Sequence, residues 1–367
     1  MQRPRVAIIG AGIFGVSCAL ELGKWCDVIV YEQNDEIMRG GTYGNQYRHH
    51  YGYHYPRSSE TVRQCQEAEK DFMAVWGKAI IRDFPAYYAI AKHDSKVSAE
   101  EFMDFCKEHR LPHDIEYPDS EFLNREEVSV CIKTAEPVYD YARLRAMAAD
   151  FLNQNQNIKI RTGHEVVGAV VEEESNIKKL LVKYRGETLE ESFDYAVNAM
   201  YANHNLFGNW FGFPVSPLEF RLKELVVVDL PRKTPIAVTI MDGSFVTLVP
   251  MGVPGQFTLG DVARSIHDTR ISSGGIPWSV EERRRPSRFE EMKKNNPRFI
   301  PIVKEARYIQ SIFSVLPVRP NSNSTDARLT AITNHGRGCW SVFEGKIITC
   351  VTAAEEVGRQ MLAQQKK

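Results

Sequence analysis

The chain has 367 residues, 43% of them hydrophobic, which is enough for two domains of roughly 100–200 residues each with buried cores. The 46 Lys and Arg residues balance 47 Asp and Glu residues, for a formal net charge of -1. Both signs are mixed even in the densest charged stretch, residues 281–294, so the chain lacks the one-sided basic surface of a nucleic-acid-binding protein.

The first predicted elements surround a glycine-rich turn. Residues 6–9 (VAII) are typical of a buried parallel strand, residues 10–15 read GAGIFG, and residues 16–23 predict a helix. In such a unit Gly10 allows the tight turn, Gly12 lets the backbone approach a diphosphate, and Gly15 lets the helix pack on the strand. The free N–H groups and the dipole at the helix start attract phosphate.

The second predicted strand, residues 28–31 (VIVY), ends at an acid. Glu32 follows the strand directly and lies 20 residues after Gly12. A carboxylate at the tip of this strand can accept hydrogen bonds from ribose hydroxyls. The spacing therefore predicts a dinucleotide-binding unit, although the motif alone does not separate FAD from NAD.

Three later segments add to this pattern. The loop at residues 41–56 (GTYGNQYRHHYGYHYP) contains an H-x-G-x-x-Y step that begins at His50, and residues 195–199 (YAVNA) form an apolar run. Near the C-terminus, LPVRP at 316–320 and DAR at 326–328 precede GKIIT at 345–349, which opens a predicted helix.

In this order, the four segments resemble the D-amino-acid-oxidase-like superfamily of FAD-dependent oxidoreductases. The group includes glycine and sarcosine oxidases, 2-hydroxyglutarate dehydrogenase and FAD-dependent glycerol-3-phosphate dehydrogenase. The resemblance implies that the loop at 41–56 passes beside the flavin and that the strand at 195–199 returns to the cofactor. Met200 and Tyr201 are departures, because many members have small residues and glycine there.

The resemblance also implies FAD as the cofactor, bound non-covalently. The sarcosine-oxidase branch carries a flavin-linked cysteine in the segment around Arg319, and this chain has none there. The histidines near His50 remain an alternative attachment point. The residues expected to bind FAD are Gly10, Gly12, Ile13, Phe14, Gly15, Glu32, Gln33, Thr42, Asn45, Gln46, Val166, Ala199, Gly345, Lys346, Ile347 and Thr349.

The expected fold class is α/β, with a discontinuous Rossmann-like FAD-binding domain and a second α+β substrate domain built on a mixed or antiparallel sheet. The family pattern assigns residues 1–50, 141–205 and 311–367 to the FAD domain, and residues 51–140 and 206–310 to the substrate domain. Apolar runs bounded by Pro and Gly at 226–230, 236–240 and 245–249 predict strands of the second sheet. Residues 58–76 and 99–110 predict helices of the same domain.

His50 and His54 are the candidate catalytic residues. Oxidation next to an amine or hydroxyl is helped by a base, and histidine suits neutral pH. His50 matches the histidine of the family's H-x-G step, and His54 occupies a position that several members fill with a substrate-contacting polar residue. The alternative is that both belong to an aromatic packing loop.

Arg319 and Arg48 are the candidate substrate-binding residues. In several family members an arginine in the RP segment clamps a carboxylate or phosphate, because a planar guanidinium suits bidentate anions. The alternative for Arg319 is a surface or interdomain salt bridge. Arg48 precedes the candidate histidines in the loop at 41–56.

The function expected from these features is an FAD-dependent oxidase or dehydrogenase. It would remove a hydride from a C–H next to an amine or hydroxyl of a small, anionic substrate. Amine and alcohol oxidation both fit, as do oxygen, a quinone or a protein as electron acceptor. The alternatives are a flavin monooxygenase that uses NAD(P)H and a non-catalytic FAD-binding subunit of a larger dehydrogenase.

The number and spacing of the cysteines indicate the cellular location of the protein and whether it binds a metal. The seven cysteines include no CxxC pair and no Cys/His cluster with zinc-ligand spacing, so no metal is expected. An odd, scattered set predicts reduced thiols and a cytoplasmic protein. The apolar stretch at 6–22 is too short and too interrupted by glycines to span a membrane. A small-molecule substrate is the one expected partner. The oligomeric state stays open.

Overall fold

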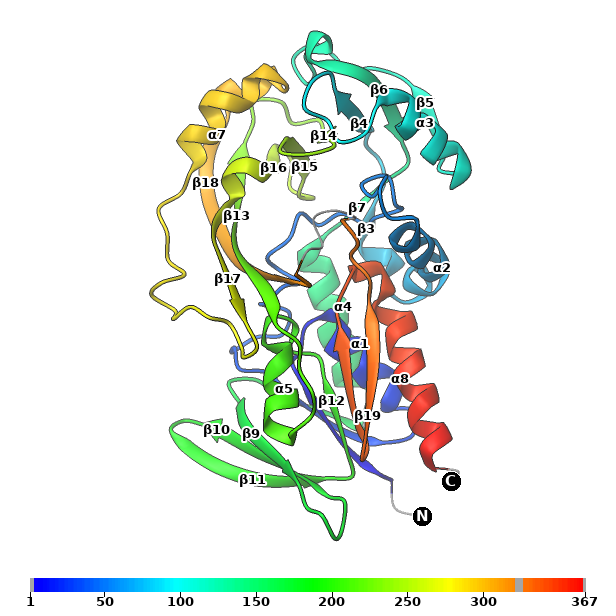
Figure 1. The fold of residues 1–367 in the computed structure, drawn as a ribbon, viewed down its shortest axis with the longest axis vertical. Helices are drawn as coiled ribbons and strands as arrows, with labels where there is room; N and C mark the ends of the chain where they lie inside the picture. The colour runs from blue at the N-terminus through cyan, green and yellow to red at the C-terminus, as the bar shows by residue number, and fades with distance from the viewer. Residues whose placement is uncertain (1–2, 321–325, 366–367) are drawn as a thin grey trace.

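The computed structural model describes residues 3–320 and 326–365, so the ends of the expected domains at 1–2, 321–325 and 366–367 lie outside the described residues. Two large sheets form the two halves of the molecule, and both termini lie at the lower end in Figure 1. The α/β fold class predicted from the sequence is confirmed. All seven cysteines are buried and unpaired.

The lower half is built on a six-stranded sheet with the order β19-β20-β12-β1-β2-β8. Neighbouring strands are parallel except for β19, which runs antiparallel to β20. This is the doubly wound arrangement that places ligands at the carboxyl ends of the strands. The strands are β1 (Arg5–Ile9), β2 (Asp27–Tyr31), β8 (Ile158–Arg161), β12 (Tyr195–Asn198), β19 (Ala331–Gly336) and β20 (Cys339–Phe343).

Four helices share one apolar core on this sheet. Helix α1 (Ile13–Leu22) packs against α8 (Cys350–Gln365) and α4 (Tyr141–Gln154), and α2 (Ser59–Trp76) packs against α8. Helix α1 begins three residues earlier than the sequence predicted, because Gly12 is already its N-cap. The expected helix after Gly345 begins as the short 3-10 helix η6 (Ile347–Thr349) and continues as α8.

A small antiparallel sheet lies beside the six-stranded sheet, at the bottom of Figure 1. Its strands are β9 (Glu165–Val171), β10 (Lys178–Tyr184) and β11 (Glu187–Phe193). Helix α5 (His204–Phe211) packs against β9 and β20, so it belongs to this half.

The upper half is built on a nine-stranded sheet with the order β17-β13-β16-β15-β14-β4-β6-β5, in which β18 also pairs with β13. The sheet is mixed, because β14 and β4 run parallel while the other pairs are antiparallel. Its strands are β4 (Ala86–Ala91), β5 (His113–Ile115), β6 (Val128–Thr134), β13 (Leu218–Asp229), β14 (Ala237–Met241), β15 (Val246–Pro250), β16 (Gln256–Asp261), β17 (Ile266–Ser272) and β18 (Arg307–Val318).

Short elements complete the chain. Strands β3 (Ile80–Ile81) and β7 (Val138–Tyr139) form a separate two-stranded antiparallel ladder. The remaining helices are α3 (Ala99–Glu108), α6 (Val262–Ser265), α7 (Phe289–Asn295), and the 3-10 helices η1 (Gly77–Ala79), η2 (Arg125–Glu127), η3 (Tyr201–Asn203), η4 (Asn296–Arg298) and η5 (Pro301–Glu305).

Strand pairing and helix packing divide the chain differently from the expected domains in several segments, including residues 206–211 of α5, which were assigned to the substrate domain but pack in the lower half. Residues 311–318 were assigned to the FAD domain, but β18 pairs with β13 from Arg307 to Val318 and so belongs to the upper sheet. Helix α2 was assigned to the substrate domain, but its buried face, including Phe72 and Trp76, joins the core of the lower half. The boundary between the two halves is therefore set by strand pairing and core packing and not by the positions of the sequence motifs.

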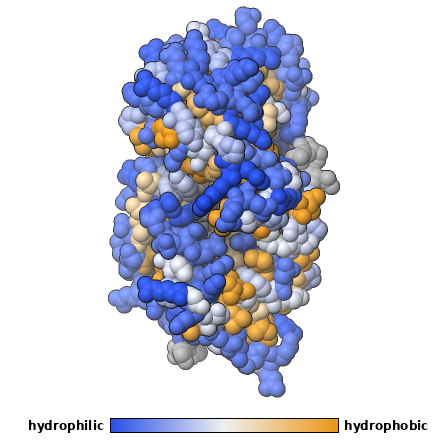
Figure 2. Space-filling model, turned by 90° about the vertical axis from the view of Figure 1, so that its left-hand side faces the viewer, coloured by the Kyte–Doolittle hydropathy of each residue, from blue (hydrophilic) through white to orange (hydrophobic). Residues whose placement is uncertain are grey.

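The side of the molecule on the left of Figure 1 is largely hydrophilic, with apolar residues in separate groups (Figure 2). Within the described residues, no helix is long and apolar enough to cross a membrane.

Candidate functional site

The turn between β1 and α1 requires two of its glycines. Gly10 has a φ of +102°, and a Cβ there would lie 2.3 Å from the carbonyl oxygen of Ala199 on the neighbouring strand. A Cβ at Gly15 would lie 1.9 Å from the carbonyl oxygen of Gly10. Gly10, Gly15 and Ala199 thus let the N-terminal end of α1 approach the carboxyl ends of the two neighbouring strands.

The N-terminus of α1 is open to a ligand. Its N-cap, Gly12, provides no side-chain cap, and a Cβ there would approach only Thr42 Oγ1, at 3.5 Å. The Ile13 N–H donates to Thr42 Oγ1 at 3.1 Å, which ties the loop after β2 to the helix. A helix start whose N-cap residue has no side chain fits the diphosphate of FAD.

Glu32 is held at the end of β2, beside the turn. Its carboxylate is only 7% exposed and accepts hydrogen bonds from the Ala11 N–H at 3.0 Å and the Asn34 N–H at 2.9 Å. Gln33 is exposed next to it, and Val166 on β9 is buried in the cluster that contains Tyr31. Glu32 thus lies at the end of β2, as the sequence predicted, and its contact with the ribose of FAD remains a prediction.

The loop at 41–46 is held by its own side chains. Asn45 Nδ2 donates to the carbonyls of Gly41 and Thr42, both at 2.9 Å, and Asn45 Oδ1 accepts from the Tyr139 hydroxyl at 2.6 Å. Gln46 Nε2 donates to Thr247 Oγ1 on β15 at 2.6 Å. These bonds fix the loop between the two sheets.

The C-terminal loop before α8 is equally constrained. A Cβ at Gly345 would lie 2.4 Å from the Arg328 carbonyl oxygen, and the Gly345 N–H donates to Thr330 Oγ1 at 2.9 Å. The Thr349 hydroxyl donates to the Lys346 carbonyl at 2.7 Å and lies 2.6 Å from Thr330 Oγ1. Thr349 therefore shapes the loop, while a direct contact with FAD remains a prediction.

A cavity of about 1200 Å³ lies between the two sheets and these loops. Eight of the predicted FAD-binding residues do not line this cavity. Gly10, Gly12, Gly15, Glu32, Gln33 and Ala199 surround the glycine turn, Val166 lies in β9, and Thr349 holds the loop before α8. The predicted residues that line the cavity are Ile13, Phe14, Thr42, Asn45, Gln46, Arg48, His50, His54, Arg319, Gly345, Lys346 and Ile347.

Both candidate histidines are uncharged at neutral pH. Burial, followed by the positive charge of Lys346, lowers the pKa of His50 to about 4, although Glu136 opposes this shift. Burial, followed by the charge of Arg48, lowers the pKa of His54 well below its usual value. The two rings lie 5.9 Å apart, so the structure brings together two neutral imidazoles.

Glu136 organises this end of the cavity and was not predicted from the sequence. It is 4% exposed, accepts a hydrogen bond from the Tyr88 hydroxyl, and lies 3.6 Å from His50 Nδ1. Arg48 Nη1 lies 3.7 Å from Glu136 and donates to the Tyr88 hydroxyl at 2.9 Å. Burial alone would raise the pKa of Glu136, but His50, Arg48 and Tyr88 together lower it, so the carboxylate is ionised.

Two lysines add positive charge. Burial, followed by the charge of Arg328, lowers the pKa of both Lys223 and Lys346 to about 8. Lys346 Nζ lies 4.5 Å from the ring centre of Tyr55. Arg319, in contrast, is exposed at the rim, 5.7 Å from the ring centre of Phe343.

Lys223 could have been found from the sequence. Glu219, Arg221 and Lys223 alternate with apolar residues in β13, and a period of two places them on one face of the strand. All three line the cavity. Glu136 carried no such signal, because its partners lie 48 to 88 positions away in the chain.

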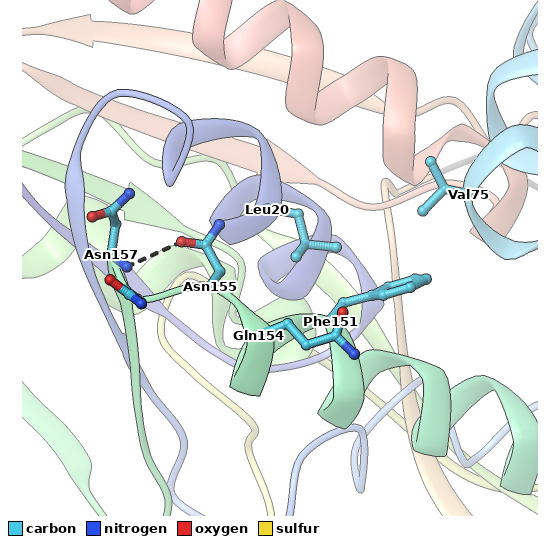
Figure 3. A pocket seen from close by; sticks show the side chains of 7 residues that line it. Leu20, Val75, Phe151, Gln154, Asn155 and Asn157 are labelled. Carbon is cyan, nitrogen blue, oxygen red and sulfur yellow. Dashed lines mark hydrogen bonds between the residues drawn. The ribbon is translucent and has the colours of Figure 1, made fainter.

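A second hollow of about 610 Å³ lies on the outer surface of the lower half (Figure 3). Leu20, Val75 and Phe151 form its apolar part, and amide side chains at 154–157 surround them, with the Asn157 N–H bonded to Asn155 Oδ1 at 3.0 Å. It contains no titratable group, so the cavity between the sheets is the candidate active site.

Comparisons with known proteins agree with this geometry. The FAD-dependent monooxygenase kojA of Aspergillus flavus is 25% identical over 389 residues, which cover 96% of this chain and 84% of that protein. Glycine oxidase from Geobacillus kaustophilus superposes with a TM-score of 0.73 at 15% identity, covering 97% of this chain and 95% of that one. L-alpha-glycerophosphate oxidase from Mycoplasma pneumoniae with FAD bound gives a TM-score of 0.71 at 14% identity, covering 99% and 95%.

The model of one protein family matches most of the chain, residues 5–349. Its description, FAD dependent oxidoreductase, confirms the resemblance found in the sequence and FAD as the cofactor. The chain belongs to the DAO family of FAD dependent oxidoreductases.

Proposed function

We propose that this oxidoreductase oxidises a small anionic substrate at a carbon that bears an amine or a hydroxyl. The observation that carries the proposal is the charge of the cavity. Lys223 and Lys346 line it, and neither has a carboxylate within 4 Å among residues 3–320 and 326–365. Partly buried cations without a carboxylate in direct contact favour an anionic ligand.

The other basic side chains of the cavity differ in their pairing. Arg57 pairs with Asp242 at 2.5 Å, and Arg328 pairs with Asp326 at 2.7 Å. Arg48 keeps its Nη1 toward Tyr88 and Glu136, while its Nε and Nη2 are buried without a hydrogen-bond partner in the described chain. Such orphaned donors fit a carboxylate, phosphate or phosphonate of the substrate.

The histidines supply the base in this proposal. FAD supplies the two-electron acceptor when it is bound. Because Glu136 faces Nδ1 of His50, it favours the tautomer with the proton on Nδ1 and leaves Nε2 free to accept a proton. His54, also neutral, is the second candidate. Arg319 would guide the anion at the rim, where it is exposed.

An anaerobic titration tests the proposal. The FAD-loaded protein is mixed with amino acids, N-methyl amines, 2-hydroxy acids and polyol phosphates, and the flavin absorption near 450 nm (roughly its usual band) is followed. We expect at least one anionic compound to bleach the flavin without NAD(P)H. Bleaching only by neutral compounds would contradict the proposal.

A flavin monooxygenase is the second candidate, because the relative from Aspergillus flavus is named as an FAD-dependent monooxygenase. The two functions differ in the source of electrons. In a flavin monooxygenase, NAD(P)H would reduce the flavin and would be consumed in proportion to the substrate. In the proposed enzyme, the substrate itself would reduce the flavin. Measuring NAD(P)H consumption with and without substrate separates them.

A further inference from the structure

Tyr201 has an unusual backbone for a large residue. Its φ is +49°, in the left-handed region that favours glycine. Its ring lies directly against Gly41 in the loop after β2, since a Cβ at Gly41 would be 2.7 Å from the ring. A strained residue of this size persists only where its surroundings hold it, and such residues concentrate at ligand sites.

Glu344 is the second unusual residue, and it precedes the loop of Gly345. It lines the cavity, yet its Oε1 is buried and has no hydrogen-bond partner within the described residues. Burial raises the pKa of Glu344 well above its usual value, which favours the protonated form of the carboxyl group. A buried protonated acid is a hydrogen-bond donor without an acceptor, which is costly unless a ligand supplies one.

The two residues occupy the same part of the cavity. Tyr201 and Phe343, the residue directly before Glu344, pack against the same apolar cluster. Gly41, Tyr201 and Glu344 all line the cavity between the sheets. Ile13 and Phe14, at the start of α1, line the same cavity.

We propose that Glu344 and Tyr201 are cofactor-binding residues whose O–H groups donate hydrogen bonds to bound FAD. The cofactor follows from the family, so the proposal does not depend on the identity of the substrate. FAD offers many acceptors along its phosphates, ribityl chain and flavin ring, and a neutral acid can approach them without charge repulsion. An ionised carboxylate at the same place would repel the diphosphate.

The test is the dissociation constant of FAD for the full chain stripped of its cofactor, measured by flavin fluorescence. Glu344→Gln keeps a neutral donor and should bind FAD within about threefold of the wild type. Glu344→Ala and Tyr201→Phe each remove one donor and should each weaken binding about 2- to 12-fold, the range of one neutral hydrogen bond. Glu60→Gln, an exposed glutamate of the same cavity, is the matched control and should change nothing.

Three results would overturn the proposal. Glu344→Ala that binds FAD as the wild type does would show that the acid is not a donor to the cofactor. Glu344→Gln that binds FAD more than about tenfold tighter would show that the native carboxyl is ionised. Unchanged FAD affinity with a raised KM would assign both residues to the substrate instead. The melting temperature of each stripped variant verifies folding, and Tyr201→Phe keeps the test open if Glu344→Ala does not fold.

Discussion

Replacement of Glu136 by glutamine should strongly destabilise the protein. The amide keeps the shape of the side chain and can still accept a hydrogen bond from Tyr88, but it removes the charge that faces Arg48. Both partners are almost completely buried, with 4% and 2% of their side chains exposed. Removing one partner of a buried ion pair costs about 3–5 kcal/mol, so the free energy of unfolding should fall by that amount at pH 7.

Urea denaturation of the wild type and Glu136→Gln measures this difference. Glu116→Gln is the matched control, because Glu116 also bonds a tyrosine and pairs with a lysine, but it is 43% exposed. An exposed pair is screened by solvent and contributes little to stability, so the control should lose much less than Glu136→Gln. Equal losses in the two variants would refute the argument from burial.

The pH dependence gives the same reasoning a second test. The folded-state pKa of Glu136 is lowered, so its contribution to stability is present above the unfolded pKa of about 4.3 and is lost as pH falls through the folded value. The difference in unfolding free energy between wild type and Glu136→Gln should therefore shrink below about pH 4. A difference that stays constant down to pH 3 would contradict the assignment of an ionised carboxylate.

Three further predictions concern the cofactor and the substrate. Gly12→Val should purify with little FAD, because the new side chain enters the space in front of α1; normal flavin content, measured by absorbance, would contradict this. Acid precipitation should release the FAD into the supernatant, and a yellow pellet would show a covalent bond. Lys346→Met should lower kcat/KM about 10- to 150-fold, because it removes a charged contact with the substrate. Arg319→Ala, at the exposed rim, should lower kcat/KM no more than about fivefold. A larger loss in Arg319→Ala than in Lys346→Met would show that the anion binds at the rim.

The parts of the fold that the sequence predicts best are those governed by local sterics. Gly10 and Gly15 are required by contacts of 2.3 Å and 1.9 Å that only glycine permits, and Glu32 follows from its distance along the chain. The helix after the turn was predicted three residues late, because Gly15 suggested a loop although it lies in the first turn of α1.

Long-range contacts account for what the sequence did not predict. Strand β18 ends directly before the RP motif, and only its pairing with β13 shows that residues 311–318 belong to the upper sheet. Glu136 lies in a loop without a motif, and its importance comes from Arg48 and Tyr88, which other elements bring to it. Tyr201 was noticed only as a departure from a family pattern, and its contact with Gly41 required the structure.

The central claim is that the cavity selects a small anion for oxidation by FAD. Its most direct test is the anaerobic reduction of the FAD-loaded protein by matched pairs of compounds, each an acid and its neutral amide or ester. For the pair that contains the best substrate, we predict that the acid reduces the flavin with an apparent second-order rate constant at least about tenfold higher, the value of one charge-assisted contact. Equal rates for the two members of that pair, or faster reduction by the neutral one, would contradict the account.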